Sequence, residues 1–261
     1  MPTDYGDRLF NFVKALNIPF LYERSFKLMQ QTLYDQRFLL TLYLPALKGE
    51  EQHFLQALAA LSNMPEPYRK LIESQIVGLR ELHIGFEQQE KTSVCKVYLE
   101  RPLLASNGKP QLVHQACKWS IESPESMAID SYHLIPVASR DEILTRIVGL
   151  SGSVNPQGLD TVKQLFLLAG DNLTLDELFY LEVEDQAKTR SSFDMKFYDA
   201  ELTMGQVEPV IYTAADYFAV PATAIEQLLA TQRDKVLGHV SSGLGRNNQA
   251  FVTYYYGVQA M

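Results

Sequence analysis

The feature of this 261-residue sequence that most restricts its fold is the regular order of its predicted elements. Two antiparallel strands are followed by two helices three times, and a last strand pair closes the series. Predicted strand pairs lie at 82–87 with 93–100, 112–121 with 132–139, 179–185 with 191–202, and 236–244 with 250–258. Predicted helix pairs lie at 50–79, 140–169 and 206–236, and a single helix covers 7–16.

The N-terminal part of the chain decides how many strands there are. Residues 37–45 form a clear strand that Pro45 stops, but residues 20–33 fit either an alternating strand or an amphipathic helix. If 20–29 is a strand, the chain has ten. Closing ten antiparallel strands into a barrel would remove the sheet edges, with a ring of helices covering the outside. We therefore predict an α+β fold of repeated ααββ units, a single domain spanning residues 1–261.

Charge and hydropathy exclude several classes of protein. The net charge of −8 argues against a nucleic-acid surface, which needs clustered excess Lys and Arg. No apolar run approaches the roughly 18–20 residues that cross a bilayer, and the first ten residues lack the basic-then-apolar order of a signal peptide, so we expect a cytoplasmic protein without a membrane partner. Cys95 and Cys117 are predicted to be reduced packing residues.

Two predicted strands carry the same polar pattern. In CKVYLE, Cys95, Val97 and Leu99 share an apolar face, so Lys96 and Tyr98 share the other. In the later stretch SFDMKFYD the polar face likewise holds a lysine and a tyrosine, together with an aspartate, and in RFLLTLYL it holds an arginine. Each strand thus has an apolar face suited to helix packing and a second face with a cation.

The meaning of that second face depends on closure. On an open sheet it is an ordinary solvated face. In a closed barrel it lines the lumen, where four cations converge with tyrosines between them, namely Arg37, Lys96, Lys118 and Lys196. Such a group would neutralise a diphosphate, and the tyrosine rings would shield a carbocation by cation–π attraction.

These residues resemble a known family. The repeated strand and helix pairs, KVY at 96–98, KFY at 196–198 and TYYYGV at 253–258 resemble the ABBA-type aromatic prenyltransferases. RSSFDMKFYDAELTMGQVEP (190–209) looks like a strand and turn of their small bacterial members, and residues 22–45 are similar to their opening hairpin. The resemblance implies a ten-stranded antiparallel barrel with the active site in its lumen, and an activity typical of natural-product biosynthesis.

Carried over to this sequence, the resemblance implies specific roles. Arg37, Lys96 and Lys196 would bind the diphosphate of a C5 or C10 allylic donor, with Lys118 in the same lumen, and Glu23 would orient the acceptor or take its proton. The residues that would shield the allyl cation are Tyr98, Tyr198 and Tyr255. The acceptor would be an indole, a phenol or a peptide side chain. No aspartate-rich metal motif is needed and none occurs, so no cofactor is obligatory, although Mg²⁺ could assist.

The sequence departs from the family in two ways. Asp194 stands where longer members often have a basic residue, so it would weaken diphosphate binding or pair with Lys196. The chain is also shorter than most of the family, which would leave one side of the barrel abbreviated or open and suit a bulky or peptide acceptor.

Other assignments stay open. The five histidines show no metal-binding spacing, and we predict no metal site; His239, which shares a face with Ser241, is either a lumen residue or a loop or core histidine. Arg246 belongs to a hairpin turn and either reaches the barrel mouth or is exposed. Tyr254 and Tyr256 are the alternative to Tyr255 as the inward-facing residues. Two rival functions also remain, a non-catalytic barrel that binds a hydrophobic ligand or a protein, and a related fold acting as a cyclase or isomerase.

Overall fold

The computed structural model describes residues 5–103, 108–151 and 154–261. The N-terminal stretch on which the expectation about a signal peptide rests lies partly outside these residues. The helices are α1 (Tyr5–Ala15), α2 (Glu51–Ser62), α3 (Glu66–Ile76), α4 (Arg140–Ser151), α5 (Pro156–Ala169), α6 (Met204–Tyr217) and α7 (Ala222–Leu229). The strands are β1 (Phe20–Met29), β2 (Thr32–Tyr43), β3 (Glu81–Gln88), β4 (Ser93–Glu100), β5 (Gln111–Ser120), β6 (Met127–Leu134), β7 (Tyr180–Asp185), β8 (Ser191–Lys196), β9 (Leu237–Leu244) and β10 (Ala250–Ala260).

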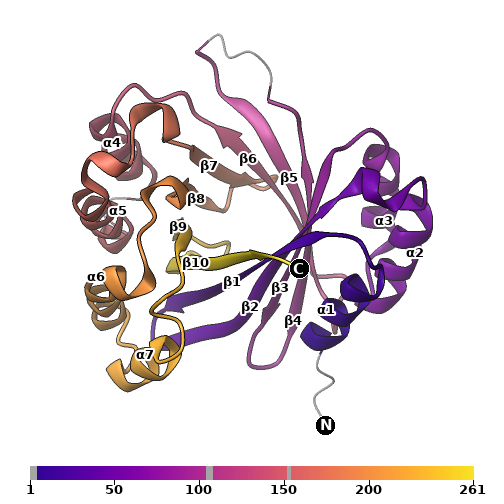
Figure 1. Ribbon diagram of the computed structural model, residues 1–261, viewed down its shortest axis with the longest axis horizontal. Helices are drawn as coiled ribbons and strands as arrows, with labels where there is room; N and C mark the ends of the chain where they lie inside the picture. Colours follow the sequence, from indigo (N-terminus) through magenta and orange to yellow (C-terminus); the bar gives the residue numbers. More distant parts are fainter. Residues whose placement is uncertain (1–4, 104–107, 152–153) are drawn as a thin grey trace.

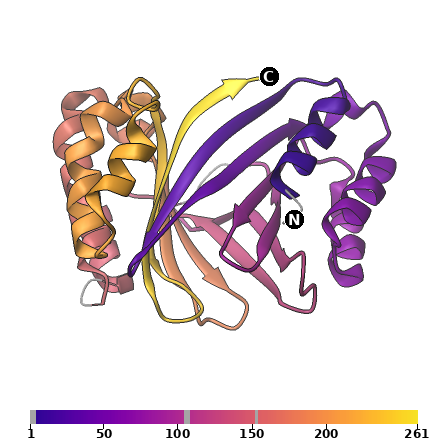
Figure 2. The same ribbon diagram turned by 90° about the horizontal axis from the view of Figure 1, so that it is seen from below.

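The ten strands form a closed antiparallel barrel (Figures 1 and 2). Each strand pairs with its neighbours in the chain, and β1 closes the barrel by pairing with both β2 and β10. Residues 20–29, which the sequence left ambiguous, are therefore a strand. The open-sheet alternative is wrong, and the polar strand faces surround a lumen.

The helices cover the barrel in two groups, α1–α3 on one side and α4–α7 on the other (Figure 2). Under the first group lie outward-facing residues of β4 and β5, including Cys95, Val97 and Trp119. Under the second lie residues of β8 and β10, including Met195 and Tyr254. Both cysteines are free and buried. None of the helices described here combines the length and apolar character that a bilayer crossing requires.

Three predicted strands have different boundaries in the structure. The strand predicted at 37–45 is β2, which begins five residues earlier at Thr32 and ends at Tyr43. The strand predicted at 132–139 is β6, which ends at Leu134 because Pro136 has no N–H for the ladder. The strand predicted at 191–202 is β8, which ends at Lys196 and is followed by a single 3-10 turn at Tyr198–Ala200. The ααββ unit occurs three times, and the β5–β6 hairpin follows β4 directly without helices, in the order that the sequence predicted.

Candidate active site

A cavity of about 610 Å³ occupies the lumen, within the size range usual for small-molecule sites. Side chains from all ten strands line it, because each strand turns its polar face inward. The lining includes every site residue that the sequence singled out, namely Glu23, Arg37, Lys96, Tyr98, Lys118, Lys196, Tyr198 and Tyr255. Tyr254 and Tyr256 face outward into the core that packs against the helices. Tyr255 faces the lumen, as the sequence predicted.

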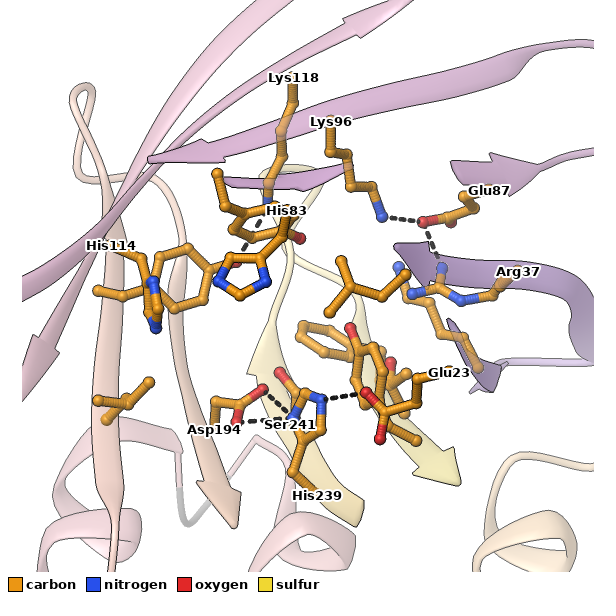
Figure 3. Close-up of a pocket in the computed structure, with 18 of the residues that line it drawn as sticks. Glu23, Arg37, His83, Glu87, Lys96, His114, Lys118, Asp194, His239 and Ser241 are labelled. Carbon is orange, nitrogen blue, oxygen red and sulfur yellow. Dashed lines mark hydrogen bonds and ion pairs between the residues drawn. The ribbon is translucent and has the colours of Figure 1, made fainter. Parts of the chain in front are cut away.

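One cationic group lies toward the barrel end formed by the hairpin turns. Its first anchor is Glu87 on β3, which binds both Arg37 on β2 and Lys96 on β4, the latter at 2.6 Å (Figure 3). Burial raises the pKa of Glu87, but the charges of Arg37, Lys96 and Lys27 outweigh it and hold this pKa well below its usual value. Glu87 is thus an ionised carboxylate that preorganises two cations at the wall of the lumen.

The second anchor of the cationic group is Asp130 on β6. It binds Lys118, Arg190 and Arg246, which come from β5, from just before β8 and from the β9–β10 turn. Burial raises the pKa of Asp130, and the three cations together lower it far more. Arg246 also approaches Asp185 at 3.3 Å, so this turn arginine lies at the barrel mouth while its side chain remains 35% exposed.

Positive charge exceeds negative charge in this region. Six cationic side chains line it, Lys27, Arg37, Lys96, Lys118, Arg190 and Arg246, against three carboxylates, Glu87, Asp130 and Asp185. Burial lowers the pKa of Lys118 well below its usual value, and the charge of Arg190 lowers it further. Buried ammonium groups that repel one another would gain from a polyanion, because each phosphate oxygen replaces lost hydration with a charge-assisted hydrogen bond.

Three tyrosine rings adjoin the cations. Lys118 lies over the rings of Tyr98 and Tyr132, 5.8 and 5.6 Å from their centroids. The Tyr132 hydroxyl also accepts a hydrogen bond from Lys118 at 3.2 Å, and Tyr255 stands on β10 across the lumen. The sequence predicted two of these rings but not Tyr132, which was placed at the first position of its predicted strand.

An acidic group lies deeper in the lumen, around Glu23 on β1. The Tyr198 hydroxyl donates to Glu23 Oε1 at 2.8 Å, and His239 Nε2 lies 3.4 Å from Glu23 Oε2 (Figure 3). The other nitrogen of His239 lies 2.8 Å from Asp194. Gly238 makes room for this arrangement, because a Cβ there would overlap Glu23 Oε1 and lie 2.7 Å from the Tyr198 ring.

His239 is an imidazolium between two carboxylates. Burial lowers the pKa of His239, but Asp194 and Glu23 outweigh burial and raise it to about 10. Asp194 therefore pairs with His239, and of the two alternatives for Asp194 the pairing with Lys196 is not found among the described residues. The lumen position of His239, which the sequence left open, is settled by its alternation with Ser241 on β9.

Lys196 lies apart from the cationic group. Its ammonium lies 3.8 Å from the centroid of the Phe179 ring, and its charge contributes to lowering the pKa of both His83 and His114. These two histidines and Glu100 form a histidine group toward the opposite end of the barrel from Arg190 and Arg246. Lys196 shares the lumen with Arg37 and Lys96, but its neighbours are these histidines and not the other cations.

The sequence held signals for some of the missed residues. Glu87 alternates with Gly85 and His83 on the inner face of β3, so the same counting that found Lys96 could have found it. Asp130 was placed in a loop by the wrong boundary of β6. Arg190 was missed and the position of Arg246 was left open because both lie in or beside turns, where no alternation indicates a direction.

Comparison with known proteins identifies the fold. No protein-family model matches the sequence, and no curated protein matches it. Among solved structures, 5-dimethylallyl tryptophan synthase from Streptomyces coelicolor, in complex with DMASPP and Trp, aligns over 90% of this chain and 78% of its own, with 12% identity and a TM-score of 0.63. AnaPT from Neosartorya fischeri aligns over 90% and 77%, with 12% identity and a TM-score of 0.55. NotF, in complex with brevianamide F and DMSPP, aligns over 90% and 79%, with 12% identity and a TM-score of 0.57.

The closed barrel, its flanking helices and its charged lumen define a PT-barrel protein. The architecture is that of the ABBA-type aromatic prenyltransferases, as the sequence motifs indicated.

Proposed function

We propose that this protein is an aromatic prenyltransferase that transfers a C5 or C10 isoprenyl group from an allylic diphosphate to an indole, a phenol or a peptide side chain. The observation that carries the proposal is the excess of cations around Tyr98, Tyr132 and Tyr255 inside a closed lumen. A diphosphate fits the charge there, and an allylic cation fits the rings beside it.

In the proposed reaction the cationic group acts on the donor. The bond between the allylic carbon and the diphosphate oxygen breaks, and both electrons leave with the diphosphate. Lys96, Lys118 and Arg190 stabilise the negative charge that develops on the departing oxygen. The lumen walls keep water from the cation, whose positive charge the tyrosine faces stabilise until the acceptor attacks.

The acidic group would act on the acceptor. Attack by the aromatic ring forms the new C–C bond, and the ring then loses one proton to restore aromaticity. Glu23 accepts a hydrogen bond from Tyr198 and faces His239, and a carboxylate keeps further lone pairs for an indole N–H or a phenol O–H. We propose that Glu23 orients the acceptor and takes its proton.

We propose that the reaction needs no obligatory cofactor. Glu87 and Asp130 are the carboxylates nearest the proposed diphosphate position, and each is already bound by two or more cations. These carboxylates therefore do not fit a resident Mg²⁺ ion. Mg²⁺ would assist only as a counterion that arrives with the diphosphate.

The direct test is turnover. Purified protein is incubated with dimethylallyl or geranyl diphosphate and a panel of indoles, phenols and peptides, in EDTA and in Mg²⁺, with products detected by mass spectrometry. Prenylated acceptor is the expected result. Thermal stabilisation by inorganic diphosphate measures occupation of the cationic group separately from chemistry.

A non-catalytic barrel is the second candidate, because the ion pairs around Glu87 and Asp130 would also serve as a purely structural network. That function predicts stabilisation by an apolar ligand and none by diphosphate. If diphosphate neither stabilises the protein nor supports turnover, the prenyltransferase proposal is wrong.

A further inference from the structure

We infer that His83, His114 and Glu100 form a binding site for a divalent transition metal, with Zn²⁺ as the reference ion and one coordination position open to the lumen. This site is separate from the cationic and acidic groups, and the inference does not depend on prenyl transfer.

The three residues come from consecutive strands. His114 on β5 lies directly across from Glu100 on β4, and His83 occupies the neighbouring strand β3. One ligand atom from each side chain lies within 4.8 Å of the others, and the two imidazole rings meet edge to face with centroids 5.4 Å apart. Ligands of a tetrahedral zinc ion at 2.0–2.1 Å stand roughly 3.3 Å from one another, so side-chain movements that shorten these separations by up to about 1.5 Å close the site.

Two buried nitrogens lack partners. His83 Nε2 and His114 Nδ1 have no hydrogen-bond partner among the described residues. An unpaired polar atom inside a protein is costly, so each such atom calls for an explanation. A metal ion would satisfy both nitrogens at once, and Figure 3 shows both imidazoles beside the same lumen.

The imidazole of His83 is also oriented as that of a metal ligand would be. Its Nδ1 lies 2.8 Å from Thr41 Oγ1 on β2, which fixes the ring and leaves Nε2 free. Metal-binding histidines commonly use the second nitrogen for a contact of this kind.

The local charge suits one divalent ion. Glu100 supplies one carboxylate, and the carboxyl group of Glu81 on the neighbouring strand lies within hydrogen-bonding reach of it. Lys196 opposes the ion, but its ammonium is held over the ring of Phe179. All three ligands line the cavity, so the fourth position of a tetrahedral ion faces the lumen. Three protein ligands and one open position are typical of zinc sites that bind water or a substrate heteroatom.

Metal binding can be measured directly. Full-length protein freed of metal with EDTA is titrated with Zn²⁺ by calorimetry and with Co²⁺ by visible absorption. We expect one equivalent of each metal and the intense absorption bands of tetrahedral Co²⁺. Glu100→Gln and His114→Ala should each weaken Zn²⁺ binding more than tenfold, and Thr41→Val roughly 10- to 100-fold.

His53→Ala is the matched control, since this histidine is exposed on α2, which lies outside the barrel. It should bind Zn²⁺ like the unmodified protein. Circular dichroism checks that each variant is folded, and Glu100→Gln preserves side-chain size where His114→Ala does not. The inference is overturned if no single equivalent binds, if Co²⁺ stays octahedral, or if His53→Ala weakens binding as much as Glu100→Gln does.

Discussion

The imidazole of His239 lies stacked on the ring of Tyr255, with centroids 3.7 Å apart and planes inclined by 14°. The stack joins the acidic group to the tyrosines of the cationic group. Because His239 is protonated, one face of Tyr255 is in contact with a cation before any substrate binds. An isoprenyl cation would use the opposite face, or the rings of Tyr98 and Tyr132.

The protonation of His239 predicts how stability depends on pH. Its folded pKa of about 10 exceeds its ordinary value of 6.5, so its stabilisation is complete below pH 6.5 and is lost as the pH rises through 10. Between these values the folded protein keeps a proton that the unfolded chain has released. The free energy of unfolding should therefore fall with rising pH, by at most about 1.4 kcal/mol per pH unit.

Denaturant unfolding from pH 6.5 to 8 measures this effect. In His239→Gln the part of the pH dependence that His239 causes should be absent. Burial lowers the pKa of Lys27 to about 8, so above pH 8 this residue makes the free energy of unfolding rise with pH. The measurement is therefore kept below pH 8. His53→Gln, an exposed control, should keep the slope. The same pH dependence in His239→Gln and in the unmodified protein would contradict a protonated His239.

Removing two opposed lysines should weaken donor binding. Lys96 and Lys118 face each other across β4 and β5, and their carboxylate partners keep Arg37 and Arg190 when the lysines are gone. Each lost charge-assisted hydrogen bond costs about 1.5–3 kcal/mol, so Lys96→Gln with Lys118→Gln should reduce affinity for a non-hydrolysable allylic diphosphate by at least roughly tenfold.

Calorimetric titration gives that affinity. Lys70→Gln is a suitable control, because Lys70 is exposed on α3 and 3.6 Å from Glu66. An equal loss in the control would mean that general charge, and not the lumen, binds the donor. Full affinity in the double variant would remove the cationic group from the proposed reaction.

Gly238 provides a test of the acidic group. In Gly238→Ala the new methyl would overlap Glu23 Oε1 and approach the Tyr198 ring, so the Glu23–Tyr198 hydrogen bond must break or shift. We expect kcat to fall at least roughly tenfold while donor affinity is kept, because a misplaced reacting group costs rate more than binding. Gly149→Ala on α4, where a Cβ would meet nothing within 4 Å, should leave both unchanged. If Gly238→Ala retains full kcat, the position of Glu23 does not matter to the reaction.

Much of this architecture follows from strand periodicity. Side chains alternate strictly along a strand, so Lys96, Tyr98 and Lys118 could be assigned to one face from their spacing alone. The same rule could not reveal which lumen residues meet. His239 reaches Glu23 and Asp194 because β9 lies one strand from β8 and two strands from β1, a relation that exists only in the closed barrel. Lys196 shows the limit most clearly, because its face was predicted and its neighbours were not.

The same limit applies to the metal ligands. Sequence motifs for metal sites rely on short spacings within one element, whereas His83, Glu100 and His114 lie on three strands. Hairpin register alone brings them together. A search for inward-facing histidines on predicted strands that are separated by one other strand would have found two of the three.

Two substitutions of Tyr98 test the contributions of its ring and its hydroxyl separately. If the ring stabilises the allylic cation, Tyr98→Phe should keep most of the single-turnover rate, and Tyr98→Leu should lose it. A cation–π contact in a desolvated site contributes about 2 kcal/mol, which corresponds to a roughly 30-fold slower step. Donor affinity should change little in either variant, because the uncharged donor carbon gains no such contact before ionisation.

Tyr217→Leu on α6 controls for loss of an exposed tyrosine and should react at the original rate. Equal rates for Tyr98→Phe and Tyr98→Leu would show that the Tyr98 ring fills space only, and would move the shielding role to Tyr132, whose own Phe and Leu variants should then differ.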